Sequence, residues 1–177
     1  MKKMKIVALA FATSLAISGG LFAFNWPQEE TSSDSFKSYF GEFRGGTINS
    51  SLIFKDSAQI KAADTGNVLL VLSDHTNSFG WFESTLGTAI ILGHEDQRET
   101  VYANLDDEKL PSYISSTDTV TEGTVLGVSG NSGWQDGISG LEFQVLDTKS
   151  SIAVNPRMLV SKSEEQKMVF IHGMNQC

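Results

Sequence analysis

The stretch Thr100-Val101-Tyr102-Ala103-Asn104-Leu105 has the two-residue period of a β-strand, in which successive side chains point to opposite faces. This period places Val101, Ala103 and Leu105 on one face, which is apolar and suited to a core. Tyr102 and Asn104 fall on the other face, which is suited to a groove. We therefore expect a half-buried strand with one apolar and one polar side.

A second strand of the same kind follows near the end of the chain. In Leu141-Glu142-Phe143-Gln144-Val145, the apolar residues Leu141, Phe143 and Val145 share one face. The opposite face carries Glu142 and Gln144, with Gly140 just before them. The pattern again predicts a strand that packs on one side and faces a groove on the other.

Short apolar or alternating runs recur along most of the chain, separated by turn-forming residues. The separators include Asp64-Thr65-Gly66, Glu122-Gly123 and a glycine-rich stretch at 130–140. Short β-branched runs with frequent turns and only three prolines are typical of an antiparallel all-β domain. No segment shows a sustained helical period. We expect strands in residues 58–63, 67–73, 88–94, 100–105, 124–128, 141–147 and 167–172.

The N-terminal residues have the pattern of an export segment. Lys2, Lys3 and Lys5 precede an uncharged, mostly apolar run at 6–24, with Leu21-Phe22-Ala23 as a small-residue cleavage site. The run is also almost long enough to span a bilayer, so a cleaved signal peptide and an uncleaved anchor both stay open. Either one places the protein in the periplasm or another extracytoplasmic space. We divide the chain into this segment (1–24), a polar linker (25–35), one domain (36–160) and a C-terminal tail with a possible extra strand (161–177).

The charge of the chain excludes some partners. The formal net charge is −8, and it becomes −11 if the export segment with its three lysines is removed. Such an acidic surface repels phosphate backbones and anionic lipids, which argues against nucleic acid and peripheral membrane binding. Cys177 is the only cysteine, so no internal disulfide can form.

Five stretches, in order between residues 36 and 160, resemble motifs of the LytM/M23 (lysostaphin-type) zinc metallopeptidases. For example, Phe40-Gly41-Glu42-Phe43-Arg44 resembles the opening Phe-Gly-x-x-Arg motif of that family. A second example is Val120-Thr121-Glu122-Gly123-Thr124-Val125-Leu126-Gly127, which resembles its V-x-x-G-x-x-I-G run. The other stretches lie at 60–68, 91–105 and 141–156. The resemblance implies a compact antiparallel sheet of the duplicated hybrid motif type, with a groove along one face.

The family's functional positions are all changed in this chain. The resemblance implies that the zinc ligands, two His and an Asp, correspond to Asn49, Glu142 and Ile53. A catalytic zinc needs three protein ligands and an open fourth position, and Ile53 cannot coordinate a metal. The two further family histidines correspond to Asn104 and Gly140, neither of which can exchange a proton near neutral pH. We therefore expect no metal, no cofactor and no catalytic residue.

The three histidines and the tryptophans Trp81 and Trp134 lie outside these positions. His75, His94 and His172 are scattered along the chain, and each is expected to be solvated or hydrogen-bonded rather than a metal ligand. Trp81 and Trp134 lie on expected loops, where they either pack over the sheet edge or stack on a partner. We expect the binding groove to be lined by Asn49, Tyr102, Asn104, Trp134, Glu142 and Gln144.

The resemblance therefore implies a pseudoenzyme. Degenerate members of the family bind and activate cell-wall hydrolases or scaffold wall remodelling, which makes an envelope protein such as a hydrolase the expected partner. A passive peptidoglycan-binding domain is the alternative. An active zinc metalloendopeptidase would require the motifs to be out of register at several places together.

Overall fold

The fold is seen in a computed structural model, which describes residues 23–29, 31–44, 46–56, 59–73, 85–133 and 139–161. Within these ranges every regular element is a β-strand or a single 3-10 turn. None of the described helical turns has the length or apolar character needed to cross a membrane. The strands are β1 (Phe36–Ser38), β2 (Phe43–Arg44), β3 (Thr47–Ile48), β4 (Leu52–Phe54), β5 (Ile60–Lys61), β6 (Gly66–Leu72), β7 (Thr88–Gly93), β8 (Arg98–Leu105), β9 (Thr119–Val120), β10 (Val125–Gly127), β11 (Glu142–Asp147) and β12 (Ile152–Val154). The 3-10 turns are η1 (Ser33–Ser35), η3 (Asp107–Lys109) and η4 (Pro156–Met158).

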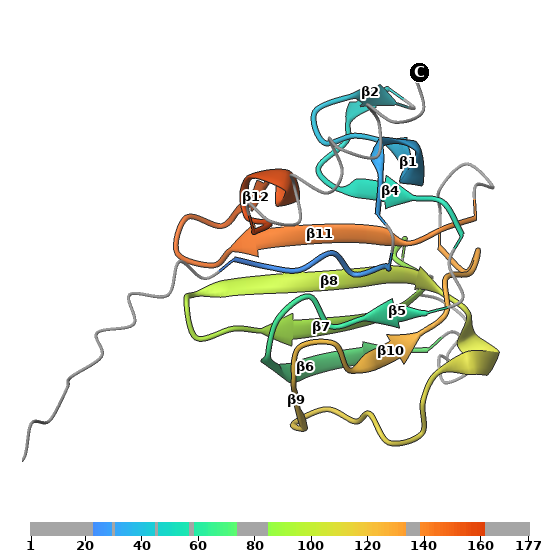
Figure 1. Cartoon of the computed structure of the whole chain (residues 1–177), viewed down its shortest axis with the longest axis vertical. Helices are drawn as coiled ribbons and strands as arrows, with labels where there is room; N and C mark the ends of the chain where they lie inside the picture. Colours follow the sequence, from blue (N-terminus) through green and yellow to red (C-terminus); the bar gives the residue numbers. More distant parts are fainter. Residues whose placement is uncertain are drawn as a thin grey trace, which may run out of the picture.

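One eight-stranded antiparallel sheet dominates the molecule (Figure 1). Its order is β1-β4-β11-β8-β7-β6-β9, and β12 pairs with the far half of β11. Two small two-stranded sheets, β10–β5 and β2–β3, stand apart from it. The antiparallel all-β fold expected from the sequence is therefore confirmed, including strands at or near residues 67–73, 88–94, 100–105 and 141–147. The possible strand at 167–172 lies outside the described residues.

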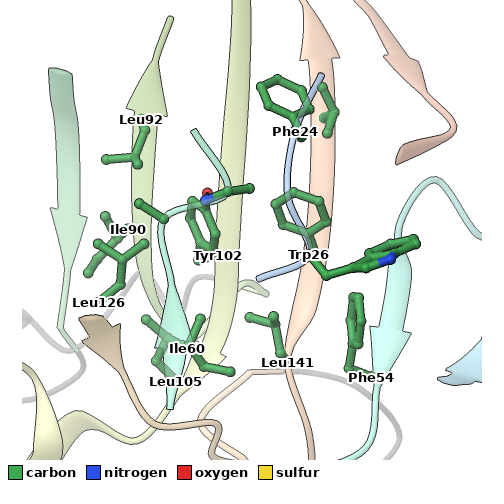
Figure 2. Close-up of a cluster of buried hydrophobic side chains, with 14 of the residues drawn as sticks. Phe24, Trp26, Phe54, Ile60, Ile90, Leu92, Tyr102, Leu105, Leu126 and Leu141 are labelled. Atoms are coloured by element: carbon green, nitrogen blue, oxygen red, sulfur yellow. Dashed lines mark hydrogen bonds between the residues drawn. The ribbon is translucent and has the colours of Figure 1, made fainter. Parts of the chain in front are cut away.

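The main core lies between this sheet and a second layer that contains β5 and β10. Ile60 of β5 and Leu126 of β10 are fully buried in the same cluster as Ile90 and Leu92 of β7. Figure 2 shows these side chains gathered in one cluster. A smaller cluster, centred on Ala89, Val101 and Ala103, occupies the opposite face of the sheet.

The segment expected to be a polar linker is instead part of the core. Phe24 is fully buried and Trp26 is 6% exposed, and the segment that carries them runs along β8 and β11 (Figure 1, Figure 2). The Phe24 amide donates to the Leu159 carbonyl oxygen at 2.9 Å, and the Lys61 amide donates to that of Pro27 at 2.9 Å. The prediction of a linker at 25–35 is therefore wrong. Its two buried polar side chains are hydrogen-bonded, since Gln28 Nε2 donates to the Lys55 carbonyl oxygen at 3.1 Å and Thr31 Oγ1 donates to that of Gln28 at 3.0 Å.

The face assignment of residues 100–105 is also wrong, because the core side of β8 carries Tyr102 rather than Val101 and Ala103, and a bulge brings Leu105 to that same side. Ile90 pairs with Tyr102 but Thr88 pairs with Leu105, so β8 has one residue more than β7 between these pairs. Asn104 takes a left-handed backbone with φ of 62° at this point. As a result Tyr102 and Leu105 both lie in the main core, as Figure 2 shows. Val101 and Ala103 lie on the opposite face.

Candidate functional site

Three adjacent strands bring two of the family's metal-ligand positions together. Glu142 of β11 pairs with Ile53 of β4 on one side and with Ala103 of β8 on the other. Paired residues of antiparallel strands share a face, so these three side chains form a row on the face opposite Phe143. Ile53 is 3% exposed and Glu142 is half-buried. The alternation predicted for residues 141–145 is therefore confirmed.

Asn49 lies beside this row and holds the chain that leads into β4. Its Nδ2 donates to Ser38 Oγ and to the Tyr39 carbonyl oxygen, each at 3.0 Å. Its Oδ1 accepts from the amide and the hydroxyl of Ser51 at 3.1 and 2.7 Å. Ser38 pairs with Ile53 across β1 and β4, which places Asn49 next to the row. The amide of Asn49 thus already has a full set of partners within the fold.

Asn104 is fully buried and joins three segments of the chain. Its Nδ2 donates to the carbonyl oxygens of Gly130 and Gly140 at 2.9 and 2.7 Å. Its Oδ1 accepts from the amide of Gly133 at 2.7 Å. Asn104 therefore fixes the glycine-rich stretch against β8, and it does not line an open groove as predicted.

Gly140 has a backbone that only glycine adopts easily. Its φ is 122°, and a Cβ at this position would lie 2.0 Å from the carbonyl oxygen of Phe54. The backbone is held there by the Phe54 amide, which donates to the Leu141 carbonyl oxygen at 2.8 Å. No histidine can occupy this position unless the backbone of β4 or of residue 140 moves.

The predicted groove residues separate into three groups. Asn49, Glu142 and Gln144 lie on or beside the face opposite the main core, where Gln144 Nε2 donates to the carbonyl oxygen and the hydroxyl of Ser50 at 3.2 and 2.8 Å. Tyr102 and Asn104 are buried, which contradicts their assignment to the groove. Trp134 lies outside the described residues, as do Trp81, His75 and His172. The alternation misassigned Tyr102 because its hydroxyl was taken as the mark of a polar face, whereas its ring lies in the main core.

The residues at the family's metal position do not suit zinc. Of the three corresponding side chains, Glu142 offers a carboxylate, Asn49 offers a neutral amide that is already bonded, and Ile53 offers no donor atom. In the described part of the chain, no group of three His, Cys, Asp or Glu side chains is arranged to hold a metal ion. The donor chemistry, with one strong ligand where three are needed, argues against a zinc site here.

His94 has a structural position away from this row. Its Nδ1 donates to the Thr65 carbonyl oxygen at 2.9 Å, and its Nε2 bonds Thr100 Oγ1 at 2.8 Å. Its ring also lies 5.3 Å from the ring of Phe24. This agrees with the sequence-based expectation of a hydrogen-bonded histidine.

Tyr102 ties the second layer to the sheet. Its hydroxyl accepts from the Ala63 amide at 2.8 Å. Burial raises the pKa of Tyr102 to about 12, against the opposing effect of its hydrogen bonds to Thr100 and Ala63. The side chain is thus a neutral part of the core at all ordinary pH values.

The chain is similar to one described protein family and to a protein of a named organism. Residues 50–156 match the family model described as Peptidase family M23. An uncharacterized protein of Treponema pallidum (strain Nichols) is 35% identical over 124 residues, which cover 66% of this chain and 82% of that protein.

Two solved structures show the same fold. The catalytic domain of a mutant of the prophage-encoded M23 protein EnpA from Enterococcus faecalis is similar with a TM-score of 0.57 and 21% identity, covering 78% of this chain and 97% of that one. The catalytic domain of the antimicrobial peptidase lysostaphin from Staphylococcus simulans is similar with a TM-score of 0.55 and 22% identity, covering 70% and 90%. At these identities the likeness concerns the fold alone.

Proposed function

The chain belongs to peptidase family M23, and we propose that it is a non-catalytic member that acts by binding a partner in the cell envelope. The observation that carries this proposal is what four of the five changed positions do in the fold. Asn49 and Asn104 hold neighbouring segments through several hydrogen bonds each. Ile53 is buried, and Gly140 is confined to a backbone without a Cβ.

This arrangement supports a scaffold whose contacts depend on the present residues at these positions. A single substitution would therefore not restore an enzyme. Restoring a zinc ligand at 49 would break a bonded network, and restoring a histidine at 140 would meet the Phe54 carbonyl oxygen. Metal-assisted hydrolysis also needs groups that activate water and handle charge, and Asn104 and Gly140 supply neither.

The proposed binding surface is the face of β4, β8 and β11 that carries Ile53, Ala103, Glu142 and Gln144. Ile53 and Ala103 are buried within this face, so a partner would contact mainly the half-buried carboxylate of Glu142 and amide of Gln144. We propose a cell-wall hydrolase or another envelope protein as the partner, and an exported, extracytoplasmic location for this chain. Peptidoglycan itself is the other ligand that the test must include.

The test combines a hydrolysis assay with two binding assays on the full chain. We expect no release of soluble peptide from purified sacculi, with or without added zinc. Cosedimentation with sacculi measures binding to peptidoglycan, and capture from envelope extract followed by identification of a cell-wall hydrolase measures binding to a protein. Release of peptide that a chelator abolishes would contradict the proposal.

A charge reversal on the proposed surface provides the specific control. Glu142→Lys should weaken capture of the partner, because it reverses the one carboxylate of the Ile53, Glu142 and Ala103 row. Glu122→Lys makes the same change at an exposed turn beside Ala62, on the opposite layer of the fold. Equal capture by the two variants, with folding verified by circular dichroism, would remove the binding site from this face.

A further inference from the structure

The hairpin formed by β2 and β3 carries two apolar side chains that the described part of the fold leaves uncovered. Phe43 is 77% exposed and Ile48 is 71% exposed. The two residues pair directly across the hairpin, so their side chains lie on the same face. Among the described residues β2 and β3 pair only with each other, and Figure 1 shows β2 at the edge of the molecule, beyond β1 and β4. The hairpin therefore presents an apolar face and outer strand edges without a described partner strand.

The base of this hairpin is held in place by hydrogen bonds. The Gly41 amide donates to the Asn49 carbonyl oxygen, and the Asn49 amide donates to that of Glu42, each at 2.8 Å. Glu42 Oε2 accepts from Ser38 Oγ at 2.8 Å and from the Tyr39 amide at 2.9 Å. The apolar face is therefore preformed. A two-stranded hairpin is only marginally stable in water, and a third strand stabilises it.

The C-terminal tail contains a segment of matching chemistry. Lys167-Met168-Val169-Phe170-Ile171-His172 is the stretch that the sequence predicts to be a further strand. Because side chains alternate along a strand, Met168 and Phe170 would share one face, and Val169 and Ile171 the other. Either face of this segment would bring two apolar side chains to the hairpin.

The described residues end close to the base of the hairpin. The guanidinium carbon of Arg157 in η4 lies 6.0 Å from the centre of the Tyr39 ring, and Asn49 Nδ2 donates to the Tyr39 carbonyl oxygen. Ser161, the last described residue, follows Arg157 by four residues. Lys167 is six residues further along, and six extended residues span roughly 20 Å. The tail is therefore long enough to bring residues 167–172 to the hairpin.

We propose that residues 167–172 add a third strand to the β2–β3 hairpin and cover Phe43 and Ile48. A strand added at an open edge gains backbone hydrogen bonds, and its alternate side chains pack on the exposed pair. The entropy cost of ordering the tail offsets most of this gain, so the contact is reversible and adds little to the stability of the domain. Asn49, at the base of the hairpin, lies beside the Ile53, Glu142 and Ala103 row, so the docked tail borders the proposed binding surface. The inference does not depend on whether that surface binds an envelope partner.

The single cysteine allows a direct test of this contact. Cys177 lies five residues beyond the proposed strand, so a nitroxide attached to it stays near a docked tail. The amide NMR signals of the isotope-labelled full chain report which residues the nitroxide approaches. We expect the signals of Thr47 and Ile48 to lose intensity until the nitroxide is reduced, and those of Leu69 and Leu70, the exposed apolar residues of β6, to keep theirs. Loss of intensity at Leu69 and Leu70, or at neither pair, would overturn the proposal.

A mixed sample separates docking within one chain from docking between two copies. Isotope-labelled chain without nitroxide is mixed with unlabelled chain that carries it at Cys177. The Ile48 signal should keep its intensity in this mixture. A loss of intensity there would show that the tail of a second copy occupies the hairpin, which would contradict docking within one chain.

Substitutions locate the contact on both segments. In the nitroxide-labelled chain, Phe170→Ser in the tail and Phe43→Ala on the hairpin should each restore the intensity of the Ile48 signal. Ile152→Ala is the control, because it removes an apolar side chain that is 57% exposed on β12, and it should leave the loss of intensity unchanged. Equal recovery of the signal in Ile152→Ala, or no recovery in Phe170→Ser, would show that these side chains do not form the contact.

Discussion

Replacing Phe24 by alanine should destabilise the domain strongly, because this residue, the last of the stretch expected to be an export segment, is part of the core. Its ring is fully buried between the ring of His94, 5.3 Å away, and the guanidinium of Arg98, 6.0 Å away. Removing a fully buried phenylalanine side chain costs about 3–5 kcal/mol in unfolding free energy. That is a large fraction of the roughly 5–15 kcal/mol that stabilises a typical domain.

The assay is urea denaturation of the full chain, followed by tryptophan fluorescence. At a denaturant slope of about 2 kcal/mol per molar, the midpoint should fall by about 1.5–2.5 M. Phe43→Ala is the matched control, because it removes the same ring where it is 77% exposed. The control should change the unfolding free energy by less than about 0.5 kcal/mol. Equal midpoints for the two variants would refute the assignment of Phe24 to the core.

Two more predictions concern residues at the candidate site and beneath it. Gly140→Ala should cost at least about 1–3 kcal/mol from backbone strain, and more from the contact of its Cβ with the Phe54 carbonyl oxygen. Gly41→Ala is the control, because Gly41 also has a positive φ, of 85°, but its Cβ would meet no atom within 4 Å. If a thermal melt shows the same loss of stability in both variants, the contact with the Phe54 carbonyl oxygen is absent. Tyr102→Phe should cost about 1–3 kcal/mol near neutral pH, because it leaves the buried Ala63 amide without its acceptor. The pKa of Tyr102 is raised in the fold to about 12, so its contribution is complete below pH 10 and is lost as the pH rises from 10 to 12. Between pH 10 and 12 the unfolding free energy, measured by urea denaturation, should therefore fall less steeply with pH for Tyr102→Phe than for the unmodified chain. The same dependence on pH in both proteins would contradict the burial of the hydroxyl.

The features that could be predicted from the sequence are those with a regular local signal. The alternation at 141–145 placed Phe143 in the core and Glu142 on the opposite face, and the structure confirms both. The ordered motifs identified the family, because their glycines and apolar positions meet backbone requirements that few other folds share. The expectation that the chain binds no zinc depends on residue chemistry alone and remains a prediction to be measured.

The features that sequence analysis missed depend on tertiary structure. The bulge at Asn104 adds one residue to β8, and the order of polar and apolar residues does not reveal it. That order also does not reveal which face Tyr102 takes, because its side chain has both an apolar ring and a hydroxyl. The segment at 25–35 contains many polar residues, yet Gln28 and Thr31 are buried with hydrogen bonds to nearby backbone carbonyls. Trp26 was the available signal, since a large aromatic residue in a supposed linker usually packs against something.

The central claim, that the ancestral metal site has been replaced by a different set of structural contacts, is tested most directly by the metal content of the purified full chain. Elemental analysis after dialysis against zinc should find far less than one zinc per chain, since Asn49 and Ile53 replace two of the three ligands. Chelator should leave the melting temperature unchanged, because no folding free energy depends on a metal. About one tightly held zinc per chain, whose removal lowers the melting temperature, would contradict the account.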